Sequence, residues 1–187
     1  MVGMHPAWLA LTGTGFTFLC TAVGAAMVFL FRGGVKANLQ RIFLGFAAGV
    51  MIAASVWSLL IPSIEMAEEQ GTIGWIPAAG GFVLGGLFLM VLDRILPHLH
   101  PGSDQPEGIS SSLKRTTMLV FAVTLHNIPE GMAVGLSFAL VAQEGTPVTL
   151  AGAMALAIGM GLQNFPEGAA ISLPLKQEGL STTRSFI

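Results

Sequence analysis

The chain has 187 residues, of which 53% are hydrophobic and only 10% are charged, and its formal net charge is −2. Soluble domains carry about 25% charged residues, so this composition excludes an ordinary soluble globular protein. The small negative charge also excludes a nucleic-acid binder, because phosphates need a basic protein surface. The composition instead indicates an all-α, multi-pass integral membrane protein in contact with a lipid bilayer.

Uncharged runs define the predicted membrane helices, because a bilayer core needs about 20 mostly apolar residues per helix. Five runs meet this length and make up one transmembrane domain over residues 1–187; they cover about residues 7–31, 42–65, 70–93, 116–142 and 146–175. The first run lacks the basic start of a secretory signal, so we expect it to be retained as a helix. The single cysteine, Cys20, lies in this run, and no intrachain disulfide can form.

Loop charges predict the orientation, because short loops rich in Lys and Arg stay in the cytoplasm. Basic residues follow the first, third and fifth runs: Arg32, Lys36, Arg41, Arg94, Lys114, Arg115, Lys176 and Arg184. The other two loops contain Glu68, Glu69 and Glu144 and no basic residue. We therefore predict that the N-terminus lies outside.

The longest connection, residues 97–115, is predicted to lie in the cytoplasm and is rich in Pro, Gly and Ser, as flexible linkers are. Its residues His98 and His100, with Asp104 and Glu107, could capture a metal ion. The alternative is a solvated linker that merely contains histidines. At the level of the sequence both interpretations stay open.

An internal repeat is the most specific feature of the chain. The stretch L-H-N-I-P-E-G-M-A at residues 125–133 returns 37 residues later as L-Q-N-F-P-E-G-A-A at residues 162–170. Leucine, asparagine, proline, glutamate, glycine and alanine recur in register, and His126 corresponds to Gln163. Matching proline-interrupted segments in two membrane helices are a sequence pointer to the substrate site of a transporter.

The spacing places the polar side chains of each copy on one helix face, because residues three and four apart are neighbours on a helix. The two predicted sets are His126, Asn127 and Glu130 in one run, and Gln163, Asn164 and Glu167 in the next. Consecutive membrane helices run in opposite directions, so the two sets can meet near the middle of the bilayer.

The prolines and glutamates need a reason to be inside membrane helices. Pro129 and Pro166 kink their helices and free the carbonyls of Leu125 and Leu162. Each acid costs at least about 2.5 kcal/mol at the bilayer centre. A bound divalent cation supplies the reason, since carboxylate, imidazole and amide oxygen are suitable ligands for zinc and other first-row metals. The alternative is that these groups hydrogen-bond between helices and only hold them together.

H-N-I-P-E-G followed by Q-N-F-P-E-G resembles the paired signature of the ZIP family of divalent metal transporters, and S-L-L-I-P-S-I-E at residues 58–65 is similar to its GufA-like branch. The resemblance implies two adjacent metal sites. His126, Glu130, Gln163 and Glu167 would form one, and Asn127, Glu130, Asn164 and Glu167 would contribute to the other.

The resemblance also implies what is transported and what the whole protein looks like. The cargo would be zinc, with iron, manganese, cadmium and copper left open, and it would move toward the cytoplasm without an organic cofactor. Family members have eight membrane helices, so we expect these five helices to be part of a longer chain. The resemblance is also compatible with a homodimer. A bacterial inner membrane is the expected location.

Two other function classes remain as alternatives. An intramembrane metalloenzyme would need an open metal position and a general base, yet the chain has no H-E-x-x-H motif and no G-x-S-x-G motif. An accessory membrane protein would use the polar motifs for helix packing and would tolerate loss of both glutamates. We therefore expect a transporter and not an enzyme.

Overall fold

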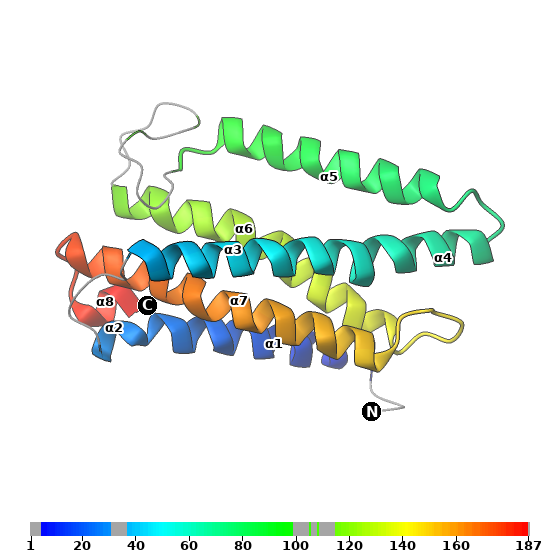
Figure 1. The fold of residues 1–187 in the computed structure, drawn as a ribbon, viewed down its shortest axis with the longest axis horizontal. Helices are drawn as coiled ribbons and strands as arrows, with labels where there is room; N and C mark the ends of the chain where they lie inside the picture. The colour runs from blue at the N-terminus through cyan, green and yellow to red at the C-terminus, as the bar shows by residue number, and fades with distance from the viewer. Residues whose placement is uncertain (1–4, 31–36, 99–104, 106–107, 109–114, 187) are drawn as a thin grey trace. The chain divides into compact units, whose positions relative to one another are not determined.

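The computed structural model describes the chain except residues 1–4, 31–36, 99–104, 106–107, 109–114 and 187. The described residues form helices and no β-strand, which confirms the predicted all-α class. Figure 1 shows the elements in chain order, and their bounds are α1 Pro6–Ala25, α2 Met27–Leu30, α3 Ala37–Ala53, the π-helix η1 Ala54–Leu60, α4 Ile61–Glu69, α5 Trp75–Ile95, α6 Arg115–Leu140, α7 Leu150–Gln177 and α8 Thr182–Phe186.

The chain divides into two compact units. The first unit comprises Met1–Pro62 and Glu130–Ile187, and the second comprises Ser63–Pro129. The division crosses α6 between Pro129 and Glu130, so the first copy of the repeated motif is shared between the units. The second copy, on α7, lies entirely in the first unit.

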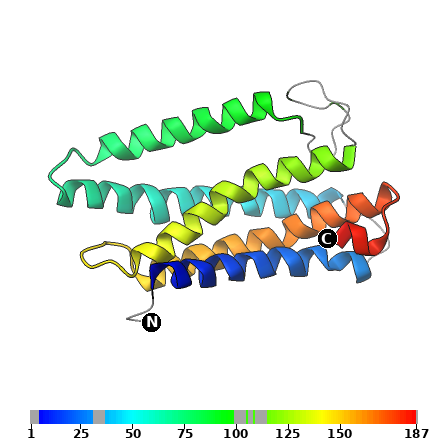
Figure 2. The same cartoon turned by 180° about the vertical axis from the view of Figure 1, so that it is seen from behind.

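In the first unit, α7 lies alongside α1, as Figures 1 and 2 both show. The contacts advance together along the two helices, since Gly161 faces Phe16 and Cys20, and Gly168 faces Thr21. Further along α7, Lys176 Nζ donates to the Val28 carbonyl oxygen on α2 at 2.9 Å. The two helices therefore run parallel, as the first and fifth spans of an alternating membrane chain must.

Glycines permit this close approach. A Cβ atom added to Gly24 would overlap the carbonyl oxygen of Phe165, and one added to Gly168 would overlap that of Thr21. Small residues bring membrane helices together because backbones can then touch directly, which replaces the hydrophobic driving force that lipid does not provide.

The apolar core of the first unit lies between α1, η1, α6 and α7. Its buried residues are Leu9, Ala54, Val134, Phe138, Ala153, Leu156, Ala157 and Met160. A smaller cluster of Val28, Ala169 and Leu173 lies toward the end of α7. The start of α7 is fixed by Thr149, whose hydroxyl accepts a hydrogen bond from the backbone nitrogen of Gly152 at 3.0 Å.

The second predicted span is helical throughout but changes its winding. Residues Ala54–Leu60 form a π-helix, and the Ile61 N–H donates to the carbonyl of Val56, five residues earlier. Pro62 follows directly and has no N–H, and its ring would crowd the carbonyl of Ser58 in a regular α-helix. A wider turn before the proline relieves this conflict.

Three of the described helical stretches are long and apolar enough to cross a membrane: Pro6–Leu30, Arg41–Glu69 and Trp75–Ile95. With 26 and 28 residues, α6 and α7 also exceed the length that a bilayer core requires, but their polar motifs lower the mean hydropathy. The protein is thus a polytopic membrane protein, and the crossing of all five predicted spans stays a prediction.

Helix ends differ from the predicted ranges where glycine and loop residues interrupt the chain. The third predicted span corresponds to α5, which begins at Trp75 and not at residue 70, because a turn with Gly71 at φ +75° precedes it. The fifth predicted span corresponds to α7, which begins at Leu150 and not at residue 146. The first predicted span corresponds to α1, which ends at Ala25, and the chain continues after a break at Ala26 as α2.

Candidate metal site

Both copies of the repeated motif lie within continuous helices. Pro129 is inside α6, and Pro166 is inside α7. Neither proline ends its helix, although each deprives one carbonyl four residues earlier of its usual donor. The polar residues of each copy therefore keep the helical spacing that the sequence predicted.

The two asparagines make the same local bond. Asn127 Nδ2 donates to the carbonyl oxygen of Val123 at 3.0 Å. With its amide nitrogen facing its acceptors, Asn164 Nδ2 donates to the carbonyl oxygen of Met160 at 3.0 Å. Each bond reaches back four residues, so the repeat in sequence is also a repeat in side-chain conformation.

The Glu130 carboxylate is held between two amides from α7. Gln163 Nε2 donates to Glu130 Oε1 at 2.8 Å. Asn164 Nδ2 donates to Glu130 Oε2 at 3.2 Å, in addition to its backbone bond. Gln163 and Asn164 are both buried, with 3% and 4% of their surface exposed. Glu130 of the first motif is therefore in contact with Gln163 and Asn164 of the second, as the repeat predicted.

Glu167 adds a second acid to this group. It lies one helical turn beyond Gln163 on α7 and is close enough to Glu130 for the two carboxylates to repel each other electrostatically. Two neighbouring carboxylates with amide groups around them form a site that favours a cation.

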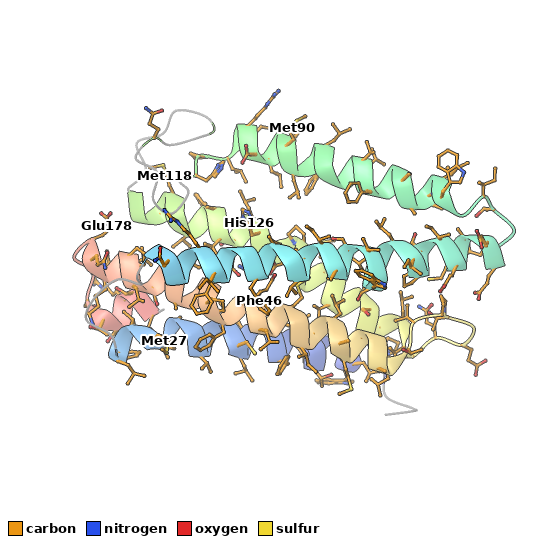
Figure 3. All side chains as sticks on the ribbon, viewed as in Figure 1. Met27, Phe46, Met90, Met118, His126 and Glu178 are labelled. Carbon is orange, nitrogen blue, oxygen red and sulfur yellow. The ribbon has the colours of Figure 1, made fainter. Side chains whose placement is uncertain are left out.

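His126 projects from α6 one turn before Glu130, where Figure 3 labels it. Its Nδ1 lies 2.8 Å from the carbonyl oxygen of Ala122. A carbonyl can only accept, so this contact assigns the proton to Nδ1 and the lone pair of the neutral ring to Nε2. Metal-binding histidines commonly use a backbone carbonyl in this way to fix the ring and its tautomer.

The predicted ligands thus fall into two described groups. Glu130, Gln163, Asn164 and Glu167 belong to the first unit, while His126 and Asn127 belong to the second. Within the described residues no three His, Cys, Asp or Glu side chains gather closely enough to hold a metal ion. The site described in the first unit therefore depends on amides as much as on carboxylates.

The two motif glycines differ in their surroundings. Gly168 packs against the backbone of α1, whereas a Cβ added to Gly131 would meet no atom of the described residues within 4 Å. Among the described residues, close packing of a motif glycine against another helix therefore occurs at the second copy of the motif. The contact of Gly168 with α1 holds α7, which carries Gln163 and Glu167, against α1.

In the loop, His98 is described and His100, Asp104 and Glu107 lie outside the described residues. His98 is buried, with its Nε2 3.0 Å from Asp93 Oδ1 and its Nδ1 2.8 Å from the carbonyl oxygen of Leu96. The pairing of Asp93 with His98 closes the end of α5. Metal capture by this loop stays a prediction.

Met160 is a neighbour of the site that the sequence motifs did not single out. Its thioether sulfur lies 3.3 Å from Gln163 Nε2, and its carbonyl accepts from Asn164. Methionine is usually a packing residue, and Met160 does lie in the apolar core. The available signal was its position three residues before Gln163, on the same helix face.

The chain is similar to several curated proteins, although no family model matches it. It is 35% identical to the zinc transporter ZIP11 of Homo sapiens, over 98% of this chain and 76% of that protein. It is 36% identical to the zinc transporter GufA of Myxococcus xanthus, over 88% of this chain and 63% of the relative. It is 37% identical to the zinc transporter ZIPB of Bordetella bronchiseptica, over 70% and 43%.

The similarity to ZIP11 extends over nearly the whole of this chain and most of the relative. It agrees with the resemblance carried by the paired H-N-x-P-E-G and Q-N-x-P-E-G motifs, and with the three apolar stretches among the described helices. The chain belongs to the ZIP family, whose members are membrane transporters for metal ions and not enzymes.

Proposed function

We propose that the protein moves zinc toward the cytoplasm through a site built by the two repeated motifs of α6 and α7. The observation that carries the proposal is the Glu130 carboxylate, which lies between the amides of Gln163 and Asn164 and close to Glu167. The relatives in human, Myxococcus and Bordetella are each named zinc transporters.

Each predicted ligand has a distinct role in this proposal. Glu130 and Glu167 supply the negative charge and bridge two adjacent metal positions. His126 supplies the nitrogen that favours zinc, through Nε2, and Gln163 completes that position with its amide oxygen. Asn127 and Asn164 supply amide oxygens to the second position. These ligands are suitable for zinc, and the absence of a thiolate among them suits a carrier that must also release its cargo.

Metal uptake into proteoliposomes tests the proposal. Purified protein with Glu130→Gln and Glu167→Gln together should lose zinc uptake, because neither position can then carry the charge that offsets the desolvation of a divalent ion. Glu144→Gln is the matched control, since Glu144 is an exposed loop residue and the chemical change is identical.

The control variant should take up zinc at the wild-type rate. Uptake by the double variant at that same rate, from correctly inserted protein, would show that the motif serves helix packing and does not form the metal path. Loss of uptake in both variants would point to a general effect of charge and would also count against the proposed site.

A further inference from the structure

The amide group of Gln163 is held by two acceptors at once. Its nitrogen Nε2 donates to Glu130 Oε1 at 2.8 Å and to Met160 Sδ at 3.3 Å. A primary amide has two N–H donors, so both contacts can be made together. Met160 is itself buried, with 5% of its surface exposed, and belongs to the apolar core. The two contacts fix which end of the amide faces Glu130.

This orientation leaves the other end of the amide without a partner. Gln163 Oε1 is buried and accepts no hydrogen bond from any residue that the structure describes. An unpaired buried acceptor costs free energy, because it has lost its hydrogen bonds to water. Gln163 would ligate a metal through this oxygen, because a neutral amide nitrogen has no lone pair to offer.

We propose that Met160 is a positioning residue that sets the metal affinity of the site by holding the nitrogen of Gln163, and not its oxygen, toward Glu130. The inference rests on the proposed function, since it assumes that Gln163 Oε1 and Glu130 bind the same ion. For that ion to be shared, the amide must turn about its terminal bond. Turning it exchanges an N–H donor beside Met160 Sδ for an oxygen, so two acceptors then face each other.

The repeat shows that this arrangement is particular to the second motif. Val123 stands on α6 where Met160 stands on α7, and its side chain has no hydrogen-bonding atom. The residue paired with it, His126, is fixed instead by the carbonyl oxygen of Ala122. That bond leaves the metal-binding nitrogen in the tautomer that zinc needs, whereas the bond from Gln163 to Met160 opposes the orientation that a metal needs.

Replacing Met160 by leucine tests the proposal, because leucine has a similar volume and cannot accept a hydrogen bond. The measurement is zinc affinity of the full protein, taken from direct binding and from the zinc dependence of uptake. We expect Met160→Leu to strengthen apparent zinc binding by about three- to tenfold, the range set by one hydrogen bond. The maximal uptake rate should stay equal or fall, because tighter binding slows release.

Two comparisons separate positioning from packing. Met154→Leu on the same helix is the matched control, since Met154 is 48% exposed, and it should leave zinc affinity unchanged. In a Gln163→Glu background a carboxylate has two equivalent oxygens and no unfavourable orientation, so adding Met160→Leu should change affinity less than twofold. The difference between the two backgrounds measures the coupling directly.

The side-chain amide of Gln163 gives a readout that needs no metal. The NMR signal of this side-chain amide is assigned by its disappearance in Gln163→Glu. The exchange of the amide hydrogens with solvent is then followed in the presence of a chelator. Met160→Leu should accelerate this exchange because one of the two hydrogen bonds is lost. If wild-type protein bound no zinc, the proposed function would fail while this measurement would still decide whether Met160 holds the amide.

Three results would overturn the inference. Weaker zinc binding in Met160→Leu would mean that the thioether helps to bind the metal. Equal strengthening in both backgrounds would mean that Met160 acts through packing and not through Gln163. Unchanged amide exchange would mean that the contact with sulfur does not hold the amide.

Discussion

His126 and His98 are both fixed by a backbone carbonyl, and the difference lies at the second ring nitrogen. In His126 the bond to Ala122 uses Nδ1, and the neutral ring keeps a lone pair on Nε2. In His98 a carbonyl faces Nδ1 and a carboxylate oxygen of Asp93 faces Nε2. The Asp93 carboxylate therefore occupies the position from which a metal ion would approach Nε2 of His98.

The imidazole of His126 should therefore decide metal preference. We expect His126→Gln, which makes the first motif match the second, to lower zinc uptake relative to manganese uptake. An amide oxygen suits the harder manganese ion better than zinc, and a roughly tenfold change in the ratio is the size expected when the surroundings of a bound metal are altered. Competition between the two ions in proteoliposomes measures it.

The matched control for this prediction is His5→Gln. His5 lies outside both motifs, and its Nδ1 accepts from the backbone nitrogen of Ala7 at the start of α1. Its replacement should leave the zinc-to-manganese ratio unchanged. A ratio that stayed at the wild-type value in His126→Gln would remove His126 from the ligand set.

Residue types and spacing allowed the candidate ligands to be predicted, but not their partners. The repeat indicated that Glu130 and Gln163 would meet, and their hydrogen bond confirms this. No spacing rule could reveal that the amide nitrogen, and not its oxygen, faces the carboxylate, because this depends on Met160. The pairing of His98 with Asp93 was missed for a similar reason, since a turn after α5 brings them together.

At the scale of helices, the contact between α1 and α7 explains why the second motif contains a glycine. We expect Gly24→Ala and Gly168→Ala each to destabilise the protein by about 1–3 kcal/mol, because the added methyl group meets backbone and neither helix can move away without losing the rest of the contact. Thermal unfolding in detergent measures the loss as a lower midpoint.

Gly15→Ala on α1 is the control, because a Cβ atom at Gly15 would meet no atom within 4 Å in the part of the chain that the structure describes. This change should leave the midpoint equal or raise it slightly, since alanine favours helix more than glycine does. If all three variants unfolded at the same temperature, the packing of α1 on α7 would not depend on these glycines.

The sequence predicted where the long helices lie more fully than which helices pack against each other. Uncharged runs located each long helix, because bilayer thickness imposes a minimum length. The choice of α1 as the neighbour of α7 depends on glycines at positions 24, 161 and 168 and on the reach of Lys176 to Val28, which no periodicity encodes. The π-helix was also missed, although Pro62 is a local cause that the sequence contains.

At the scale of the whole molecule, the exposed apolar surface and the charged ends of the helices predict how the chain crosses the bilayer. At 1.5 Å per residue the 28 residues of α7 extend over about 42 Å, which exceeds the hydrocarbon thickness of about 30 Å. Residues just before and just after α7 should therefore lie on opposite sides of the membrane. The basic residues Lys176 and Arg184 predict that the end of α7 is cytoplasmic.

Single cysteines test this orientation, because Cys20 is the only natural cysteine and can be replaced by alanine. In that background we expect Glu144→Cys to react with a membrane-impermeant maleimide in intact cells, and Gln177→Cys to react only after the membrane is opened. Both residues are exposed, so a failure to react cannot come from burial within the described chain. Reaction of Gln177→Cys alone in intact cells would reverse the predicted orientation. Reaction of both variants in intact cells would mean that α7 does not cross the bilayer. The proposed zinc path, which includes Gln163 and Glu167 of α7, would then be wrong.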